Sequence, residues 1–254
     1  MRRIRVIPVL LLHNRGLVKS VRFRNYKYVG DPINAVRIFN EKEVDEIFIL
    51  DITATRQGRE PDRDHICEIV SEAFMPLGYG GGIGSLAQAE RLFFSGIEKV
   101  VMNHAAVHNP RLIGEISDRY GRQSVCASID CRAGWFGRRT AYSRNGEENL
   151  GIDPVDLAKR FEAAGAGEIL LNSIDRDGTY EGFDLRTIER VSAAVNLPVV
   201  ACGGAGSVDD FRRAVDAGAS AVAAGSMFVF QRPHNAVLIS YPSRELLGKE
   251  SVRK

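Results

Sequence analysis

Cysteine and long apolar runs are scarce in this chain, and each scarcity excludes a class of protein. Only four cysteines occur in 254 residues, and none has the CxxC spacing of a zinc site. No apolar stretch reaches the roughly 18 residues that cross a bilayer, and Pro8 and His13 break the first apolar run too early for a signal peptide. We therefore expect a cytoplasmic protein without a membrane segment. We expect its cysteines to be buried, reduced thiols: Cys67, Cys126, Cys131 and Cys202.

Excess charge of one sign is also absent. Lysine and arginine total 34 against 32 acidic residues, and a net charge of +2 gives no reason to expect nucleic acid or a membrane surface as partner. The composition that remains, 44% hydrophobic and 26% charged, is ordinary for a globular protein. A barrel of alternating strands and helices takes roughly 250 residues. Residues 1–254 can therefore form a single domain.

Short apolar runs alternate along the chain with amphipathic stretches. Eight runs are candidate strands: Arg5–Leu11, Glu46–Leu50, Pro76–Tyr79, Lys99–Met102, Ser124–Ile129, Glu168–Leu171, Pro198–Ala201 and Ala219–Ala224. Four stretches between them repeat apolar residues at helical spacing: Pro32–Glu43, Leu86–Phe94, Pro154–Ala164 and Val208–Ala217. Eight strand-then-helix units predict an α/β fold, a closed (β/α)8 TIM barrel rather than an open sheet, with the reactive face at the carboxyl ends of the strands.

An internal repeat supports the barrel. The stretches "YGGGIGSLAQAERLFFSGIEKVVMN" and "ACGGAGSVDDFRRAVDAGASAVAAG" share glycines, a serine before a helix, a closing glycine and an apolar strand. The offset between Gly81 and Gly203 is 203 − 81 = 122, and Ser85 and Ser207 have the same offset. A half-barrel used twice would produce this period.

The repeated glycines also predict the chemistry of the ligand. Glycines between a strand and a helix start let backbone N–H groups approach an anion, and the helix terminus adds favourable partial charge. Two such turns at one mouth suit a small molecule with a phosphate at each end. The residues expected to bind phosphate are Gly81, Gly82 and Asn103 in one half, and Gly203, Gly204, Gly225 and Ser226 in the other.

Five motifs together resemble the HisF family, the cyclase subunit of imidazole glycerol phosphate synthase. They are "DITA" from Asp51, "GGGI" from Gly80, "NHAAVHNP" from Asn103, "SIDRDGT" from Ser173 and "GGAG" from Gly203. The resemblance implies a (β/α)8 barrel without a cofactor. It also implies that a glutaminase (HisH-like) subunit docks on the N-terminal face and sends ammonia through the barrel core. At the opposite mouth the ammonia would meet a bis-phosphorylated ribulosyl substrate.

The resemblance assigns further residues, with one departure. Asp130, at the end of "CASID", matches one of the two catalytic aspartates of the family, and Lys19 matches its mobile-loop lysine. Leu11 stands where the other aspartate belongs, and leucine cannot exchange a proton. The resemblance also places Asp177 and Gly178 at a phosphate, and Asp51 and Ser173 at the substrate.

A second set of matching positions lies at the amino ends of the strands. The family surrounds its ammonia entrance with two cations and two anions, and all four charges are kept here. They are Arg5, Glu46, Lys99 and Glu168. Such charges enter a barrel core only if they pair with one another, so this set is either an ammonia gate or a purely structural salt-bridge layer.

The missing aspartate leaves several functions open. One is a HisF-like paralogue that supplies ammonia for acetamidino-sugar formation in surface polysaccharide, together with a separate amidotransferase. Another is a true cyclase of histidine biosynthesis, in which a group such as His13 substitutes for the lost acid. The related sugar-phosphate isomerase needs the same aspartate, and a phosphate aldolase or epimerase lacks support from a strand lysine or a metal cluster.

Two further features are ambiguous in the sequence. His104 and His108 have the i, i+4 spacing of a metal pair, but no third ligand is evident, so we expect no metal site. Residues 131–154 are too long and polar for an ordinary βα connection. Their aromatic residues Trp135, Phe136 and Tyr142 among arginines predict a hairpin over the mouth, as a substrate lid or a protein contact.

Overall fold

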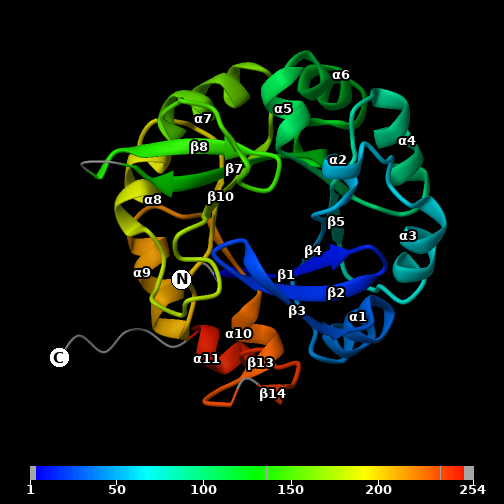
Figure 1. Ribbon diagram of the computed structural model, residues 1–254, viewed down its shortest axis with the longest axis vertical. Coiled ribbons are helices and arrows are strands. Elements are labelled where there is room, and N and C mark those ends of the chain that lie inside the picture. The colour runs from blue at the N-terminus through cyan, green and yellow to red at the C-terminus, as the bar shows by residue number, and fades with distance from the viewer. Residues whose placement is uncertain (1–3, 135–136, 235, 249–254) are drawn as a thin grey trace.

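The computed structural model describes residues 4–134, 137–234 and 236–248, and eight parallel strands in it close into a barrel (Figure 1). Each strand pairs with the next, and the last, β12, pairs with β1 through Arg5 opposite Ala221. The predicted (β/α)8 fold is therefore confirmed. The barrel strands are β1 (Arg5–His13), β4 (Ile47–Asp51), β5 (Leu77–Gly80), β6 (Lys99–Met102), β7 (Val125–Ala133), β10 (Glu168–Ser173), β11 (Val199–Cys202) and β12 (Ala221–Ala224).

The helices surround the barrel, as the amphipathic stretches predict. Asp31 and Asp153 cap two of them by accepting hydrogen bonds from backbone N–H groups, and each is followed by a proline in the first helical turn. The longer helices are α1 (Pro32–Glu41), α3 (Arg63–Val70), α4 (Leu86–Phe94), α6 (Arg111–Tyr120), α7 (Pro154–Ala163), α8 (Leu185–Ser192) and α9 (Val208–Asp216). Short helical turns are α2 (Ala54–Gln57), α5 (His104–His108), η1 (Arg122–Ser124), α10 (Ser226–Val229) and α11 (Arg244–Gly248).

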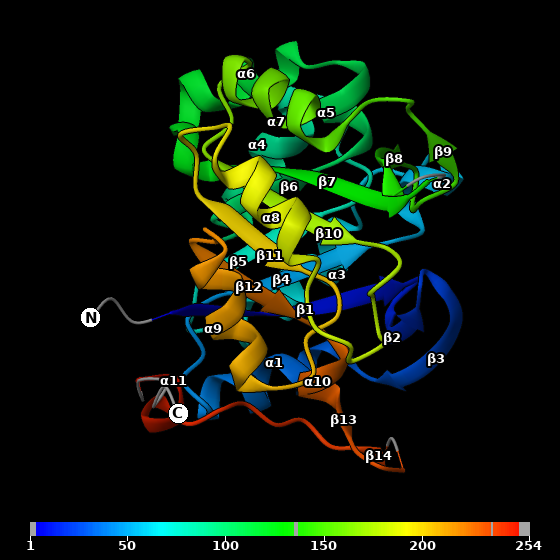
Figure 2. The same cartoon turned by 90° about the vertical axis from the view of Figure 1, so that its left-hand side faces the viewer.

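Two antiparallel hairpins extend the barrel at its carboxyl end, and Figure 2 shows both on the same side of the molecule. The first hairpin, β2 (Gly16–Val21) with β3 (Arg24–Gly30), follows directly from β1, where the sequence suggested a loop. The second, β8 (Arg139–Ser143) with β9 (Glu148–Asn149), continues from β7, as expected for residues 131–154. Trp135 and Phe136 lie outside the described residues. A further small sheet joins β13 (Phe230–Gln231) to β14 (Ala236–Val237).

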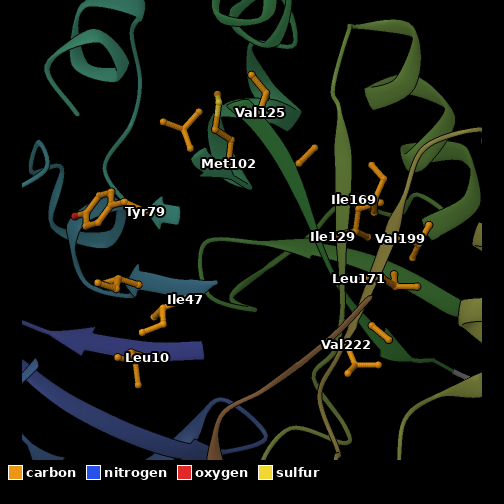
Figure 3. Close-up of a cluster of buried hydrophobic side chains, with 14 of the residues drawn as sticks. Leu10, Ile47, Tyr79, Met102, Val125, Ile129, Ile169, Leu171, Val199 and Val222 are labelled. Carbon is orange, nitrogen blue, oxygen red and sulfur yellow. The ribbon is translucent and has the colours of Figure 1, made fainter. Parts of the chain in front are cut away.

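Successive side chains of a strand point to opposite faces of the sheet, and they form two separate apolar layers here. Leu10, Ile47 and Val222 belong to the layer between strands and helices, and Figure 3 shows side chains of this layer around the barrel. Val9 and Phe48, one residue away, belong instead to a smaller cluster inside the barrel. The parity of each strand position therefore decides whether a side chain packs outside or faces the interior.

The half-barrel repeat is visible in the backbone. β5 and β11, α4 and α9, and β6 and β12 each begin at the same offset as the glycines. Ser85 and Ser207 cap their helices with nearly equal angles, φ −150° and −152°. At Gly81 and Gly203, φ is +110° and +86°, in the left-handed region. A Cβ there would overlap the carbonyl oxygen of Asp51 or of Ser173 respectively, which are themselves equivalent positions.

Three of the four cysteines are buried and free, as expected, but the fourth differs: Cys67 is exposed, because it lies on the outer face of α3. No helix in the described ranges combines the length and apolar character needed to cross a membrane.

The glycine turns give a stability prediction. Gly58 also has a positive φ, +63°, but a Cβ at this position would meet no other atom within 4 Å, so Gly58→Ala should cost about 1–2 kcal/mol of unfolding free energy. Gly81→Ala should cost about 2 kcal/mol more, because its methyl group meets backbone that cannot move aside. Urea unfolding followed by circular dichroism measures both; equal losses would contradict the close approach.

Candidate functional site

A cavity of about 470 Å³ opens at the carboxyl ends of the barrel strands, the face where barrel enzymes place their active sites. Residues that the sequence predicts to bind a ligand or to act in catalysis come together there from both halves of the chain. On its wall lie Lys19, Asp51, Gly81, Gly82, Asn103, Asp130, Asp177, Gly178, Gly203, Gly204, Gly225 and Ser226. The structure therefore brings these side chains and turns to one place, while their individual roles remain predictions.

Asp130 is a buried acid of the cavity. It lies near the end of β7, is 8% exposed and accepts a hydrogen bond of 3.3 Å from Asn172 Nδ2. Burial raises the pKa of the Asp130 carboxyl to about 7; the Asn172 bond opposes this rise, and the nearby charge of Asp177 adds to it. A carboxyl that titrates near neutral pH can both donate and accept a proton there.

Lys19 lies on a strand rather than in an irregular loop. It lies on β2, is 5% exposed, and its Nζ donates a hydrogen bond to the backbone oxygen of Val9. Burial lowers the pKa of Lys19 to about 8, although the charge of Asp177 opposes the shift. The β2–β3 hairpin therefore fixes this amine against the cavity wall beside Gly225.

Strand parity corrects the prediction for Ser173. Inside β10, Leu170 and Asn172 face the cavity, so Ser173 points the other way and does not line it. Asn172, which the sequence did not single out, takes that place. Among the described residues no donor reaches its buried Oδ1, which leaves an acceptor for a bound molecule.

Asp177 differs from an ordinary phosphate ligand. Its carboxylate accepts a hydrogen bond of 2.9 Å from Ser20 Oγ, and burial raises its pKa. A carboxylate repels a phosphate, whereas the adjacent backbone at Gly178, with φ +70°, can approach one. In this segment the backbone is thus better suited than the side chain to hold an anion.

Two expected ligands are already engaged within the protein. Asp51 Oδ1 accepts bonds from the N–H groups of Thr53 and Ala54, at 2.8 and 2.9 Å. Asn103 Nδ2 donates to the backbone oxygens of Ser128 and Tyr142, at 3.0 and 3.3 Å. Both side chains therefore shape the cavity wall by holding turns and the hairpin in place. Basic side chains at the same wall, which favour an anionic ligand, are Arg56, Arg59 and Arg144.

Leu11 also lines the cavity, and its surroundings are apolar. It is opposite Leu50 in the barrel register and packs against the interior cluster. His13, which could have replaced a missing acid, is exposed at the end of β1, beside Tyr26, and does not line the cavity.

The four charged residues of the N-terminal end form a closed ring of ion pairs. Lys99 Nζ contacts Glu46 Oε1 at 2.8 Å and Glu168 Oε2 at 2.9 Å. Arg5 contacts Glu46 Oε2 at 3.0 Å and also pairs with Glu168. Burial raises the pKa of Glu46 despite the two cations, whereas the two acids outweigh burial and raise the pKa of Lys99. Each acid thus has two cationic partners.

An apolar interior separates this charged ring from the cavity. The buried side chains of this interior are Ile7, Val9, Phe48, Val101, Cys126, Leu170, Val200, Cys202, Ala221 and Ala223. Gly78 makes room for one of them, since a Cβ there would meet the ring of Phe48. Several of the others are small, which suits a narrow path for a small neutral molecule.

The sequence predicts the second hairpin over the mouth but did not show which residues it contributes. Its turn brings Arg144 and Asn145 to the cavity wall. The same hairpin brings Glu148 to His104 and His108, so the third potential metal ligand that the sequence did not reveal is present. The unusual length of residues 131–154 was the only signal of these contacts. Burial, together with the charge of His108, lowers the pKa of His104.

Fold and site together define a class: a (β/α)8-barrel protein with a polar, glycine-rich cavity at one end and a ring of paired charges at the other. The family described as "Histidine biosynthesis protein" matches residues 5–233.

Three curated relatives identify the family within this class. A Pseudomonas aeruginosa protein named "Putative imidazole glycerol phosphate synthase subunit hisF2" is 54% identical over 94% of this chain and 96% of its own. A Vibrio vulnificus protein of the same description, hisF3, is 47% identical over 96% and 94%. "Imidazole glycerol phosphate synthase subunit HisF" of Streptomyces avermitilis is 42% identical over 89% and 90%. The chain belongs to the HisF family.

Asp130 gives a pH prediction. Between about pH 4 and pH 7 the Asp130 carboxyl is ionised in the unfolded chain but keeps its proton in the folded one. The free energy of unfolding therefore falls as the pH rises through that range. Asp130→Asn removes the penalty. Its unfolding free energy relative to wild type should rise by about 2–4 kcal/mol from pH 4.5 to pH 8. The exposed Asp156→Asn is the control, and a pH-independent difference for Asp130→Asn would contradict the assignment.

The charged ring gives a stability prediction. Lys99→Met leaves two buried carboxylates with Arg5 alone, so we expect a loss of about 3–5 kcal/mol in thermal or urea unfolding. Arg213→Met breaks an exposed helix pair with Asp209 and should cost under about 1 kcal/mol. Similar losses for both variants would show that the ring is not effectively buried.

Proposed function

We propose that this chain is the ammonia-accepting subunit of a two-protein glutamine amidotransferase complex. A glutaminase of the HisH kind would dock on the N-terminal face, over Arg5, Glu46, Lys99 and Glu168. Ammonia released there would pass through the barrel core and react at the opposite mouth. The observation that carries this proposal is the combination of a paired charge ring, an apolar interior and a polar cavity on one axis.

The ring has properties that suit a gate. Because each glutamate has two cationic partners, the loss of one ion pair during opening leaves neither acid unpaired. Ammonia is neutral and carries no tightly held hydration shell, so it can enter an apolar interior that would exclude ammonium.

The opposite mouth has properties that suit a phosphorylated acceptor. The equivalent turns at Gly81 and Gly203 lie on its wall, together with Arg56, Arg59 and Arg144. Backbone amides at the two turns, with guanidinium groups on the same wall, favour a small molecule with separated phosphates. Asp130, with its raised pKa, is the group we propose for proton transfer near the site of amination.

Leu11 is the residue from which we infer the product of the complex. The resemblance places a second catalytic aspartate at this position, and a positioned acid or base typically contributes 10²–10⁴-fold to a rate. We therefore propose that cyclisation to imidazole glycerol phosphate is severely reduced. The ammonia would instead serve an acetamidino-sugar of surface polysaccharide, with a separate amidotransferase that completes the transfer.

One observation favours the competing function, a true cyclase. Asp177 lies on the same cavity wall, and its charge acts on Asp130. A pair formed by these two acids could move protons without an acid at position 11.

A growth test separates the two functions. With a competent glutaminase, the wild-type chain should not restore histidine prototrophy to a strain that lacks the cyclase subunit. Leu11→Asp should do so, with a gain of at least about 10²-fold in imidazole glycerol phosphate formation. Leu11→Asn, similar in size but unable to act as an acid, should remain inactive. Growth with the wild-type chain would overturn the paralogue function.

A further inference from the structure

Two imidazoles and a carboxylate meet at the rim of the cavity. His104 and His108 lie one turn apart on α5, with ring centroids 4.3 Å apart. Glu148 comes from β9, at the far side of the second hairpin. One ligand atom from each residue lies within 4.8 Å of the other two.

The distances fit a small divalent cation. His108 Nε2 lies 3.1 Å and His104 Nδ1 lies 3.5 Å from Glu148 Oε2. Bonds of 2.0–2.1 Å in a tetrahedral zinc site place neighbouring ligand atoms about 3.3 Å apart. Two of the ligand-atom distances are therefore close to this value, and all three are within 4.8 Å.

We propose that His104, His108 and Glu148 bind one divalent cation, zinc by the nature of the donor set, which fastens the β8–β9 hairpin to α5. Two histidines and one glutamate form a known zinc-ligand combination, and three protein ligands leave a fourth position for water or an oxygen of a bound molecule. A second group supports the carboxylate. The Oγ of Ser143 lies 3.2 Å from His104 Nδ1, a contact that a metal on this nitrogen would replace. Ser143 is fully buried and also donates a hydrogen bond to Glu148. Such outer contacts orient metal ligands.

The ion would connect the hairpin to the cavity. Arg144 and Asn145 lie in the turn between β8 and β9 and line the cavity, as does His104. Fixing Glu148 to α5 would therefore hold these side chains in place over the mouth. The positive charge of Arg144 acts on His104 and would oppose a metal ion there, whereas the negative charge of Glu148 would favour it.

Without metal, the same geometry is a hydrogen-bond cluster between Glu148 and the two histidines. The two explanations differ in a measurable quantity, the affinity for zinc. Equilibrium dialysis of the untagged, full-length chain against zinc chloride, with metal analysis of the protein fraction, measures this affinity. Hydrogen exchange of residues 137–149 with and without zinc reports on the hairpin.

We expect one zinc ion per chain and slower exchange in the hairpin when zinc is bound. His108→Ala and Glu148→Gln should weaken binding at least tenfold, and Ser143→Ala about tenfold. Glu147→Gln, next to Glu148 but paired with Arg56, and the exposed His234→Ala should bind as wild type does. Circular dichroism of each metal-free variant checks that it folds.

Two results would overturn the proposal. One is a wild-type chain that binds zinc no more tightly than folded His108→Ala. The other is binding that persists in His108→Ala and Glu148→Gln, which would place the ion elsewhere, for example at the exposed Cys67.

Discussion

The mutual neutralisation of four charges at one end of the barrel is the constraint on which the rest of the structure depends. Three of them, Arg5, Lys99 and Glu168, are the first residues of their strands, and Glu46 directly precedes a fourth strand. Because a buried charge without a partner is strongly destabilising, these strands must start at one level. The same register then aligns their carboxyl ends, so the ion pairs at one face help to define the cavity at the other.

The two ends of the barrel therefore serve different physical purposes. At the amino end, opposite charges satisfy one another and leave no free group for a ligand. At the carboxyl end, burial leaves acids with raised pKa values and an amide oxygen without a donor. Buried acids with raised pKa values and an unsatisfied amide oxygen lower folding stability, and they are typical of a site that binds or transforms a small molecule. The apolar interior keeps the two environments apart.

The sequence was sufficient to predict the fold and the end of the barrel at which the cavity lies. The eight apolar runs and the repeated glycine turns are local signals, and the barrel follows from them by general rules of strand connection. Properties set by register or by distant contacts were not readable. Ser173 faces away from the cavity because of strand parity, and Lys19 is buried because β1 continues into a hairpin. Glu148 meets two histidines about 40 residues away only because β8 and β9 fold back over α5.

Passage of ammonia through the core is the central claim, and isotope partition tests it most directly. The complex with its glutaminase and the completing amidotransferase would be supplied with glutamine labelled with ¹⁵N in the side-chain amide, in the presence of unlabelled ammonium. If ammonia travels inside the barrel, the amidated product carries ¹⁵N in large excess over the label in the bulk ammonium. A product whose label equals that of the bulk ammonium would contradict the account.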